Sequence, residues 1–291
     1  MTDTLERPVG PPNPAPSPTP RGPGARALTW VGGIVGGVLL LSGAYSAVDL
    51  LAMGSEGATT VAESATYDGA PVVELVADGH VTVTTGGDRV EVDRTSRTVL
   101  STATYRVDES SDRLRVSYRC EWWRPGFCSA SLDVTVPDGT SVIVRALDGT
   151  VTATSLRGPL DVHVSDGSVD VSEIDGDVTV RSADARTSVR DVRGTVDVSS
   201  ADGPIEISDV SGDVTAQSSD GRTEIWDARA NIDVRSSDGG VTVHGTGRPV
   251  ALDITTADGR QTVEGAVDPT SPIHVRIDTV DGYVEYLGPR G

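Results

Sequence analysis

Glycine or alanine recurs every nine residues, without a slip, through the second half of this chain. Every second member of the series follows an aspartate, so the true repeat is eighteen residues long and has two similar halves. A fixed period in this range is typical of proteins built from stacked structural repeats. The positions are Gly149, Gly158, Gly167, Gly176, Ala185, Gly194, Gly203, Gly212, Gly221, Ala230 and Gly239.

Each half of the repeat predicts a short β-strand that ends in a tight bend. Residues 166–174 and 175–183 alternate apolar and polar side chains before the next turn, which is the pattern of a half-buried strand. The apolar positions recur in four columns, which should point inward and stack on copies of themselves. The columns are Val151, Val169, Thr187, Ile205, Thr223 and Val241; Ala153, Val171, Val189, Ile207, Ile225 and Val243; Leu160, Val178, Val196, Val214 and Ile232; and Val162, Val180, Val198, Ala216 and Val234.

Two architectures fit this pattern, an antiparallel meander closed into a barrel and a two-sided β-solenoid with one eighteen-residue coil per repeat. The solenoid is favoured because hairpin loops in a meander can vary in length, whereas this period never slips. One outward column also alternates in charge, which keeps like charges apart only if successive coils are neighbours; it reads Asp161, Thr179, Asp197, Thr215 and Asp233. We therefore predict an all-β fold with in-register parallel strands about 4.8 Å apart.

The regular solenoid is expected over residues 141–288. Residues 67–140 should form an irregular β cap or the first coils, because a repeat array needs atypical ends to cover its core. Two later Asp-Gly pairs, at Asp258 and Asp281, follow after steps of twenty and twenty-three residues. The extra residues are expected to form bulged turns at 247–249 and 268–272.

The start of the chain predicts a membrane anchor. Residues 1–26 are rich in proline and should form a disordered tail. Residues 27–48 carry no charge, and as a helix they would span about 33 Å, enough to cross the hydrocarbon core. We predict a transmembrane helix over 27–53, followed by a linker over 54–66. Glycines spaced four apart within it match a helix-dimer pattern, so a helix-mediated dimer is possible.

The charges around this segment set its orientation. Arginines precede it and acidic residues follow it, so the tail should be cytoplasmic and the C-terminal domain extracellular, at the cell membrane. A cleaved signal peptide is the alternative. It is less favoured because the stretch before the apolar run is long for a signal peptide.

The overall charge narrows the choice of partners. The chain holds 43 acidic and 24 basic residues, with a net charge of −19. Nucleic acid is an unfavourable partner for such a chain, because its affinity comes mainly from neutralised phosphates. No nucleophile motif, phosphate-binding loop or zinc spacing occurs, and the four histidines, at 80, 163, 244 and 274, share no column suited to a metal triad. His163 and Arg181 do share one, which alternating surface polarity explains.

The aspartates of the repeat form the most regular polar feature. Carboxylates about 4.8 Å apart would repel by roughly 1 kcal/mol in bulk water. The favoured interpretation is that each carboxylate caps the N–H groups of its own turn. The alternative is a row of bound cations, with calcium preferred for its oxygen ligands. The residues are Asp148, Asp166, Asp184, Asp202, Asp220 and Asp238.

A short cysteine-bounded segment holds two of the four tryptophans and the only phenylalanine. Cys120 and Cys128 enclose Trp122, Trp123 and Phe127, and outside the cell the two cysteines should form a disulfide. The aromatic side chains should plug the end of the solenoid. The alternative is an exposed contact tip for a glycan, a partner protein or the membrane.

One pair of acidic residues could suggest a polysaccharide-active enzyme. Glu206 and Glu224 fall one coil apart on an outward column, with Asp170 and Trp226 nearby, and paired carboxylates beside a tryptophan occur in glycoside hydrolases. Any solvated acidic column gives the same spacing, however. The sequence therefore predicts no catalytic residues, no cofactor and no enzyme.

The layout resembles the bacterial putative-adhesin family of β-strand-repeat envelope proteins. The matching residues are the Val-Pro-Asp-Gly segment at 136–139 and the Asp-Gly-x-Val-x-Val units that follow it, over about residues 70–288. The resemblance implies an envelope-exposed β-solenoid and carries no catalytic residue across. We expect a structural or adhesive module that binds an envelope polymer or a surface protein. An accessory or sensor domain in envelope-stress signalling is the alternative.

Overall fold

The structure is a computed structural model that describes residues 58–121, 123 and 126–290. The predicted tail, the predicted helix over 27–53 and the first residues of the predicted linker lie outside these ranges. Within them, no helix has both the length and the apolar character that a membrane crossing needs. The described residues fall in one compact unit, Ala52–Gly291.

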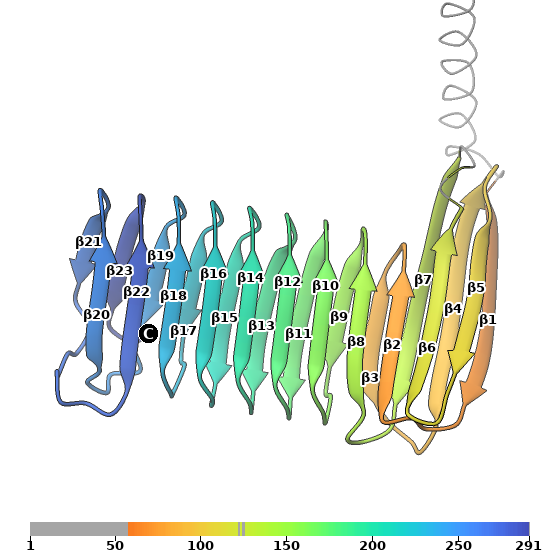
Figure 1. Cartoon of the computed structure of the whole chain (residues 1–291), viewed down its shortest axis with the longest axis horizontal. Helices are drawn as coiled ribbons and strands as arrows, with labels where there is room; N and C mark the ends of the chain where they lie inside the picture. The colour runs from red at the N-terminus through yellow and green to blue at the C-terminus, as the bar shows by residue number, and fades with distance from the viewer. Residues whose placement is uncertain (1–57, 122, 124–125, 291) are drawn as a thin grey trace, which may run out of the picture. The chain divides into compact units, whose positions relative to one another are not determined.

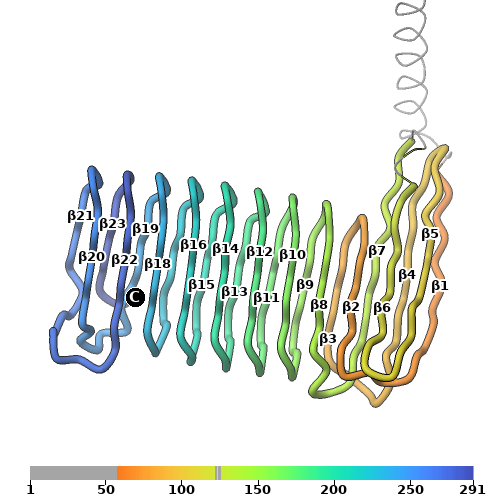
Figure 2. The backbone as a smooth tube through the Cα atoms, viewed as in Figure 1, coloured from red at the N-terminus to blue at the C-terminus, as the bar shows by residue number. Residues whose placement is uncertain are grey.

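Two β-sheets face one another along this unit (Figures 1 and 2), and each coil contributes one strand to each sheet. Sheet A has 12 strands, in the spatial order β1, β4, β7, β3, β9, β11, β13, β15, β17, β19, β23, β21. Sheet B has 11 strands, in the order β20, β22, β18, β16, β14, β12, β10, β8, β2, β6, β5.

The strands of sheet A are β1 (Thr59–Tyr67), β3 (Val81–Thr85), β4 (Val90–Val99), β7 (Phe127–Val136), β9 (Thr150–Thr154), β11 (Ser168–Ile174), β13 (Arg186–Val192), β15 (Ile205–Val210), β17 (Thr223–Trp226), β19 (Val241–His244), β21 (Arg260–Val263) and β23 (Tyr283–Leu287). The strands of sheet B are β2 (Val72–Ala77), β5 (Ala103–Glu109), β6 (Arg113–Cys120), β8 (Ser141–Ala146), β10 (Leu160–Val164), β12 (Val178–Ser182), β14 (Val196–Ser200), β16 (Val214–Ser218), β18 (Ile232–Ser236), β20 (Ala251–Thr256) and β22 (His274–Thr279).

The strand register confirms the eighteen-residue coil. Strand β10 pairs in parallel with β12, with Leu160 opposite Val178, and β11 pairs in parallel with β13 in the same way. The same offset continues through β18 in sheet B and β19 in sheet A. The repeat region is therefore a two-sided parallel solenoid and not an antiparallel barrel.

The four predicted inward columns form the core between the sheets. Their valine and isoleucine side chains are buried, as β-branched residues on a pleated surface should be. Thr187 and Thr223 occupy the same column as Val169 and are fully buried. Their hydroxyl groups have no hydrogen-bond partner in the described part of the chain. Threonine therefore fits this column by its β-branched shape, although burying its hydroxyl group costs free energy.

Sheet A carries a periodic irregularity that the sequence did not predict. Five non-glycine residues spaced by eighteen adopt left-handed backbone angles, with φ between 52° and 57°. Aspartate tolerates this conformation better than most residues, which accounts for the three aspartates among the five. The residues are Ser155, Glu173, Asp191, Asp209 and Asp227.

At the N-terminal end, the order of the strands in space differs from their order in the sequence. The coil β2–β3 lies against β8–β9, and β6 and β7 form the next coil outward. Beyond these, β5 pairs antiparallel with β6, while β4 pairs antiparallel with both β7 and β1. Residues 59–66, expected as part of a linker, instead form most of β1.

The C-terminal end is built in the same interleaved manner. The chain passes from β19 to the outermost strands β20 and β21, and then returns so that β22 lies between β20 and β18 and β23 lies between β21 and β19. Asp281 therefore neighbours Asp238, because its N–H donates to Ser237 O at 2.8 Å. The expected simple bulged turns at 247–249 and 268–272 are wrong, since these segments connect coils out of sequence order.

Candidate functional site

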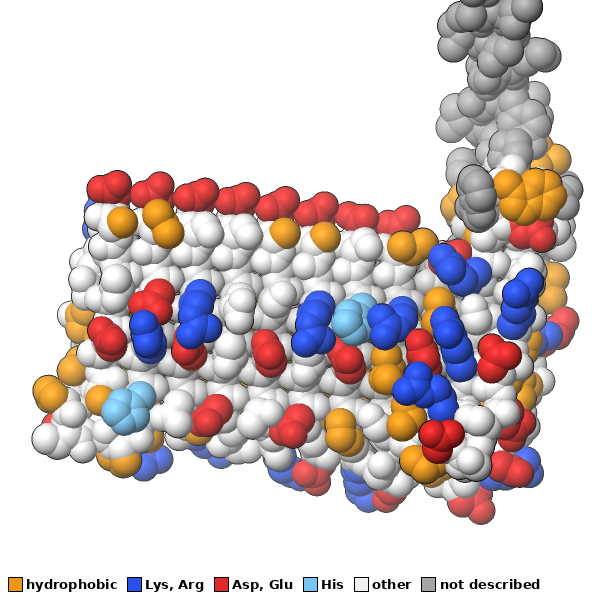
Figure 3. Space-filling model, viewed as in Figure 1, with side chains coloured by type: hydrophobic (Ala, Val, Ile, Leu, Met, Phe, Trp, Pro, Cys, Tyr) orange, Lys and Arg blue, Asp and Glu red, His pale blue; other side chains and the backbone are white. Residues whose placement is uncertain are grey.

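The six predicted aspartates stand in a row along one edge, where sheet B turns into sheet A (Figure 3). All six side chains are exposed. From Asp166 to Asp238, their backbone N–H groups donate to carbonyls of the preceding coil, as Asp184 N does to Ser165 O at 2.9 Å. Within the described ranges, no backbone N–H donates to any of the six carboxylates. The predicted turn capping is therefore wrong, because the neighbouring coil already uses these N–H groups.

The stacking of these carboxylates affects their protonation. Partial dehydration, together with the carboxyls of Asp220 and Asp184, raises the pKa of Asp202 above its usual range. No three His, Cys, Asp or Glu side chains converge so as to hold a metal ion in the ranges that the structure describes. Calcium binding along the row stays a prediction.

Carboxylate capping occurs instead at the opposite edge. Asp177 Oδ1 accepts hydrogen bonds from Thr195 N and Thr195 Oγ1, both at 2.8 Å. Two coils later, Asp213 Oδ1 accepts hydrogen bonds from Asn231 N at 3.0 Å and from Asn231 Nδ2 at 3.1 Å. The bonds from Thr195, led by its backbone N–H, lower the pKa of Asp177. These aspartates join successive coils, which is a structural role.

In the cysteine-bounded segment, the aromatic side chain of Trp123 is exposed. Cys120 and Cys128 form a disulfide that joins β6 to β7. Trp123 is 64% exposed, and Phe127 is half-buried at the start of β7. Trp122 lies outside the described residues. The core at this end is covered by β1, β4 and β5 instead, so the predicted plug is wrong for Trp123.

The acidic pair Glu206 and Glu224 does lie on neighbouring strands, as predicted. Each carboxylate has basic partners. Arg186 lies 3.6 Å from Glu206, and Arg290 forms an ion pair with Glu224 while stacking over Trp226, 4.2 Å from the ring centre. His244 Nε2 lies 3.9 Å from Glu224. Both carboxylates are thus engaged in ion pairs, which does not suit the acid and base roles that glycoside hydrolysis requires.

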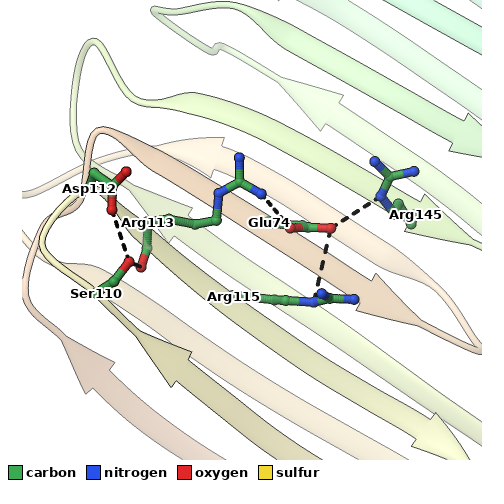
Figure 4. Close-up of polar contacts among 6 residues, drawn as sticks. All are labelled: Glu74, Ser110, Asp112, Arg113, Arg115 and Arg145. Carbon is green, nitrogen blue, oxygen red and sulfur yellow. Dashed lines mark hydrogen bonds and ion pairs between the residues drawn. The ribbon is translucent and has the colours of Figure 1, made fainter.

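Sheet B holds an arginine cluster that sequence reasoning missed (Figure 4). Glu74, on β2, has a side chain only 6% exposed. Its carboxylate lies 3.0 Å from Arg113 Nη1, 3.1 Å from Arg145 Nε and 4.0 Å from Arg115 Nε. The three guanidinium groups come from β6 and β8, on either side of β2. A buried carboxylate therefore holds three half-exposed arginines in fixed positions.

Next to this cluster, the outer face of sheet B is hollowed over β2, β8 and β10. The hollow has a volume of about 430 Å³, within the range of small-ligand clefts. We call it the sheet B groove. Small side chains such as Val76 and Ala146 line it, and its charged lining consists of Asp78 with the cationic or ionisable Arg115, Arg119, Arg145, His163 and Arg181.

Three of these groups lie in register on adjacent strands. Arg145 pairs with His163, and His163 pairs with Arg181. The sequence predicts the last two as one column of alternating surface polarity. The spacing of eighteen also includes Arg145 and could have shown that this column does not alternate. Arg115 and Arg119 lie in the irregular region, so no period could have placed them.

Residues 75–286 match the family Toastrack DUF4097. A comparison with curated proteins finds no match. Among solved structures, one described as a putative adhesin from Bacteroides fragilis is 13% identical, covers 80% of this chain and 98% of its own, and has a TM-score of 0.44. A putative adhesin from Parabacteroides merdae is 11% identical, with coverage of 79% and 96% and a TM-score of 0.41. A putative lipid binding protein from Parabacteroides distasonis is 12% identical, with coverage of 79% and 97% and a TM-score of 0.43.

Proposed function

The chain belongs to the Toastrack DUF4097 family, and we propose that it acts as a non-catalytic binding module of the bacterial cell envelope. The rigid outer face of sheet B is the observation that carries this proposal. Its parallel strands are hydrogen-bonded on both sides from β22 to β6, so the outward side chains form a fixed array. An array of this kind suits a partner with repeating groups, such as an envelope polymer.

Membrane anchoring is part of the proposal and rests on the sequence. The uncharged segment 27–48, with arginines before it and acidic residues after it, supports a single-pass anchor with the solenoid outside the cell. The disulfide between Cys120 and Cys128 fits an oxidising compartment. The exposed Trp123 adds a second contact surface at the tip.

A retention experiment tests the binding role. The full chain, held in a neutral detergent, is incubated with purified bacterial cell walls and then pelleted. We expect the protein to co-sediment with the walls and to be released by soluble wall fragments. Recovery of all the protein in the supernatant would contradict the proposal.

The same assay separates an adhesive role from a sensor role. A variant that lacks residues 1–24 should retain full wall binding if the protein is a structural or adhesive module. A sensor would need that tail for a cytoplasmic partner. Capture of a bacterial cytoplasmic protein by the full chain but not by the shortened chain would favour signalling.

A further inference from the structure

We propose that the sheet B groove is a binding site for a chain of phosphate groups carried by an envelope polymer. This inference rests on the proposed binding function and names the ligand class of the same face. Three features of the face support it: the local charge, the arginine donors left unused by the ion pairs, and the shape.

The groove is a cationic region on an acidic protein. Five arginines in or beside the groove, at 113, 115, 119, 145 and 181, form ion pairs with three carboxylates, those of Glu74, Asp78 and Asp161. These ion-paired groups together carry a net charge of +2 with His163 neutral, whereas the whole chain carries −19. Arg145, His163 and Arg181 form one row across three adjacent strands, and Asp161 lies 3.1 Å from His163 and 3.4 Å from Arg181.

The ion pairs that hold these arginines leave their outer donors available. Arg145 and Arg115 approach Glu74 through Nε, and Arg119 approaches Asp78 through Nε at 3.6 Å. In the described part of the chain, no hydrogen bond engages their terminal nitrogens, and their side chains are 48–54% exposed. Glu74 and the partly buried Asp78 hold these guanidinium groups in place, so less side-chain freedom is lost when they bind a ligand.

The geometry favours phosphate over carboxylate. Guanidinium groups approach the groove from β6 on one side and from β8 and β12 on the other. A phosphate presents several oxygens in different directions and can accept from more than one guanidinium at once. The row Arg145, His163 and Arg181 continues across three strands about 4.8 Å apart, which provides successive positions for neighbouring phosphates.

The rest of the face argues against an anionic membrane surface as the partner. The next outward column of sheet B carries Asp161, Asp197 and Asp233, and these carboxylates would be brought close to any flat anionic surface that covered the sheet. A single polymer chain that lies in the groove avoids Asp197 and Asp233, because these lie on β14 and β18, outside the groove.

The test compares two double variants of the full chain in neutral detergent. Arg145→Gln/Arg181→Gln removes two groove arginines. Arg235→Gln/Arg276→Gln removes the same charge from the same sheet, where each arginine pairs with an aspartate two residues away. Binding of tripolyphosphate and of poly(glycerol phosphate) is measured by calorimetry, with citrate as the carboxylate probe.

We expect both phosphate probes to bind the natural chain more tightly than citrate does. The groove variant should lose at least about tenfold in affinity, since hydrogen bonds to charged groups are the strong ones, and the control variant should stay within about twofold. Equal losses in both variants, no phosphate binding by the natural chain, or citrate binding as tight as phosphate would overturn the proposal. So would preferential binding to anionic phospholipid vesicles.

The cell-wall retention assay, run with the same variants, separates this inference from the proposed function. Walls that retain the groove variant as well as the natural chain would leave the binding function standing and refute the groove as its site. Walls that retain neither chain would refute the binding function itself.

Discussion

Glycine recurs at the aspartate edge because successive turns stack closely there. A Cβ atom added at Gly203 would lie 2.0 Å from Ala185 O, and one added at Gly221 would lie 2.2 Å from Gly203 O. Positive φ angles occur at Gly149 and Gly167 but not at Ala185 or Gly203. Along most of this edge, space between turns and not backbone conformation therefore selects the small residue.

Gly203→Ala should lower the free energy of unfolding by about 1–3 kcal/mol, because overpacking forces the turns apart. The matched control is Gly288→Ala, where an added Cβ meets nothing within 4 Å and the change should stay within about 0.5 kcal/mol. Urea unfolding curves measure both. Equal midpoints for the two variants would contradict the steric explanation.

Glu74 is the only charged residue that is buried in the described part of the chain. Its carboxylate is buried and contacts three arginines, so Glu74→Gln should destabilise the fold by about 1–3 kcal/mol. The arginines are half-exposed, and water compensates them in part. Glu206→Gln is the control, since that carboxylate is 40% exposed and has one ion pair at 3.6 Å. A similar small effect of both changes in urea unfolding would argue against this role.

At the scale of the element, the two edges of the solenoid use aspartate in opposite ways. Asp177 accepts two hydrogen bonds from the next coil, whereas Asp202 faces other carboxyls. Their pKa values consequently shift in opposite directions. Stability should therefore respond to pH with opposite sign at the two edges.

Asp177→Ala should cost about 1 kcal/mol at neutral pH, the value of an exposed hydrogen-bonded cap. Because its pKa is lowered on folding, its contribution is present above the unfolded value of about 4 and is lost as the pH falls through the folded value. The melting temperatures of variant and natural chain should therefore converge in acid. A gap that is constant between pH 7 and pH 3 would rule out the charged cap.

Asp202→Asn should raise the melting temperature at neutral pH. The pKa of Asp202 is raised on folding, so the folded state holds this proton more tightly than the unfolded chain does. Its contribution to stability is present in acid and lost as the pH rises through the folded pKa. The gain should therefore vanish below about pH 4 and shrink in high salt. A lower melting temperature at pH 7 would show that the row is already neutralised, for example by bound cations.

The strand register of the repeat region could be predicted from the sequence, because residues eighteen apart are neighbours on adjacent strands. The strand pairing of the irregular segments could not be predicted, because these segments do not follow the period. The segments 86–137 and 245–273 place strands beside partners far away in sequence, such as β19 beside β23. The candidate groove shows the same limit, since Arg145, His163 and Arg181 follow the period, whereas Glu74 and Arg115 lie in the irregular region.

At the scale of the whole molecule, the last strand in sequence is not the last strand in space. Strand β23 is bonded to β19 on one side and to β21 on the other. Hydrogen exchange should therefore be slower at Val284 and Tyr286 than at Thr262 in the edge strand β21, although the former are closer to the chain end. Mass spectrometry of peptic fragments measures this. Faster exchange across 283–287 than across 260–263 would show that the end of the chain frays.

The interleaved ends also bear on how the domain carries load. A solenoid whose coils followed the chain in order would peel away one coil at a time when its terminus was pulled. Here a pull on the C-terminus acts on a strand flanked on both sides, so its hydrogen bonds must shear together and not open in succession. A pull from the N-terminus can detach β1 from its edge, but it then reaches β2, which lies between β6 and β8. If the N-terminus were anchored and the domain bound a polymer, these interlocked coils would therefore resist unfolding under tension.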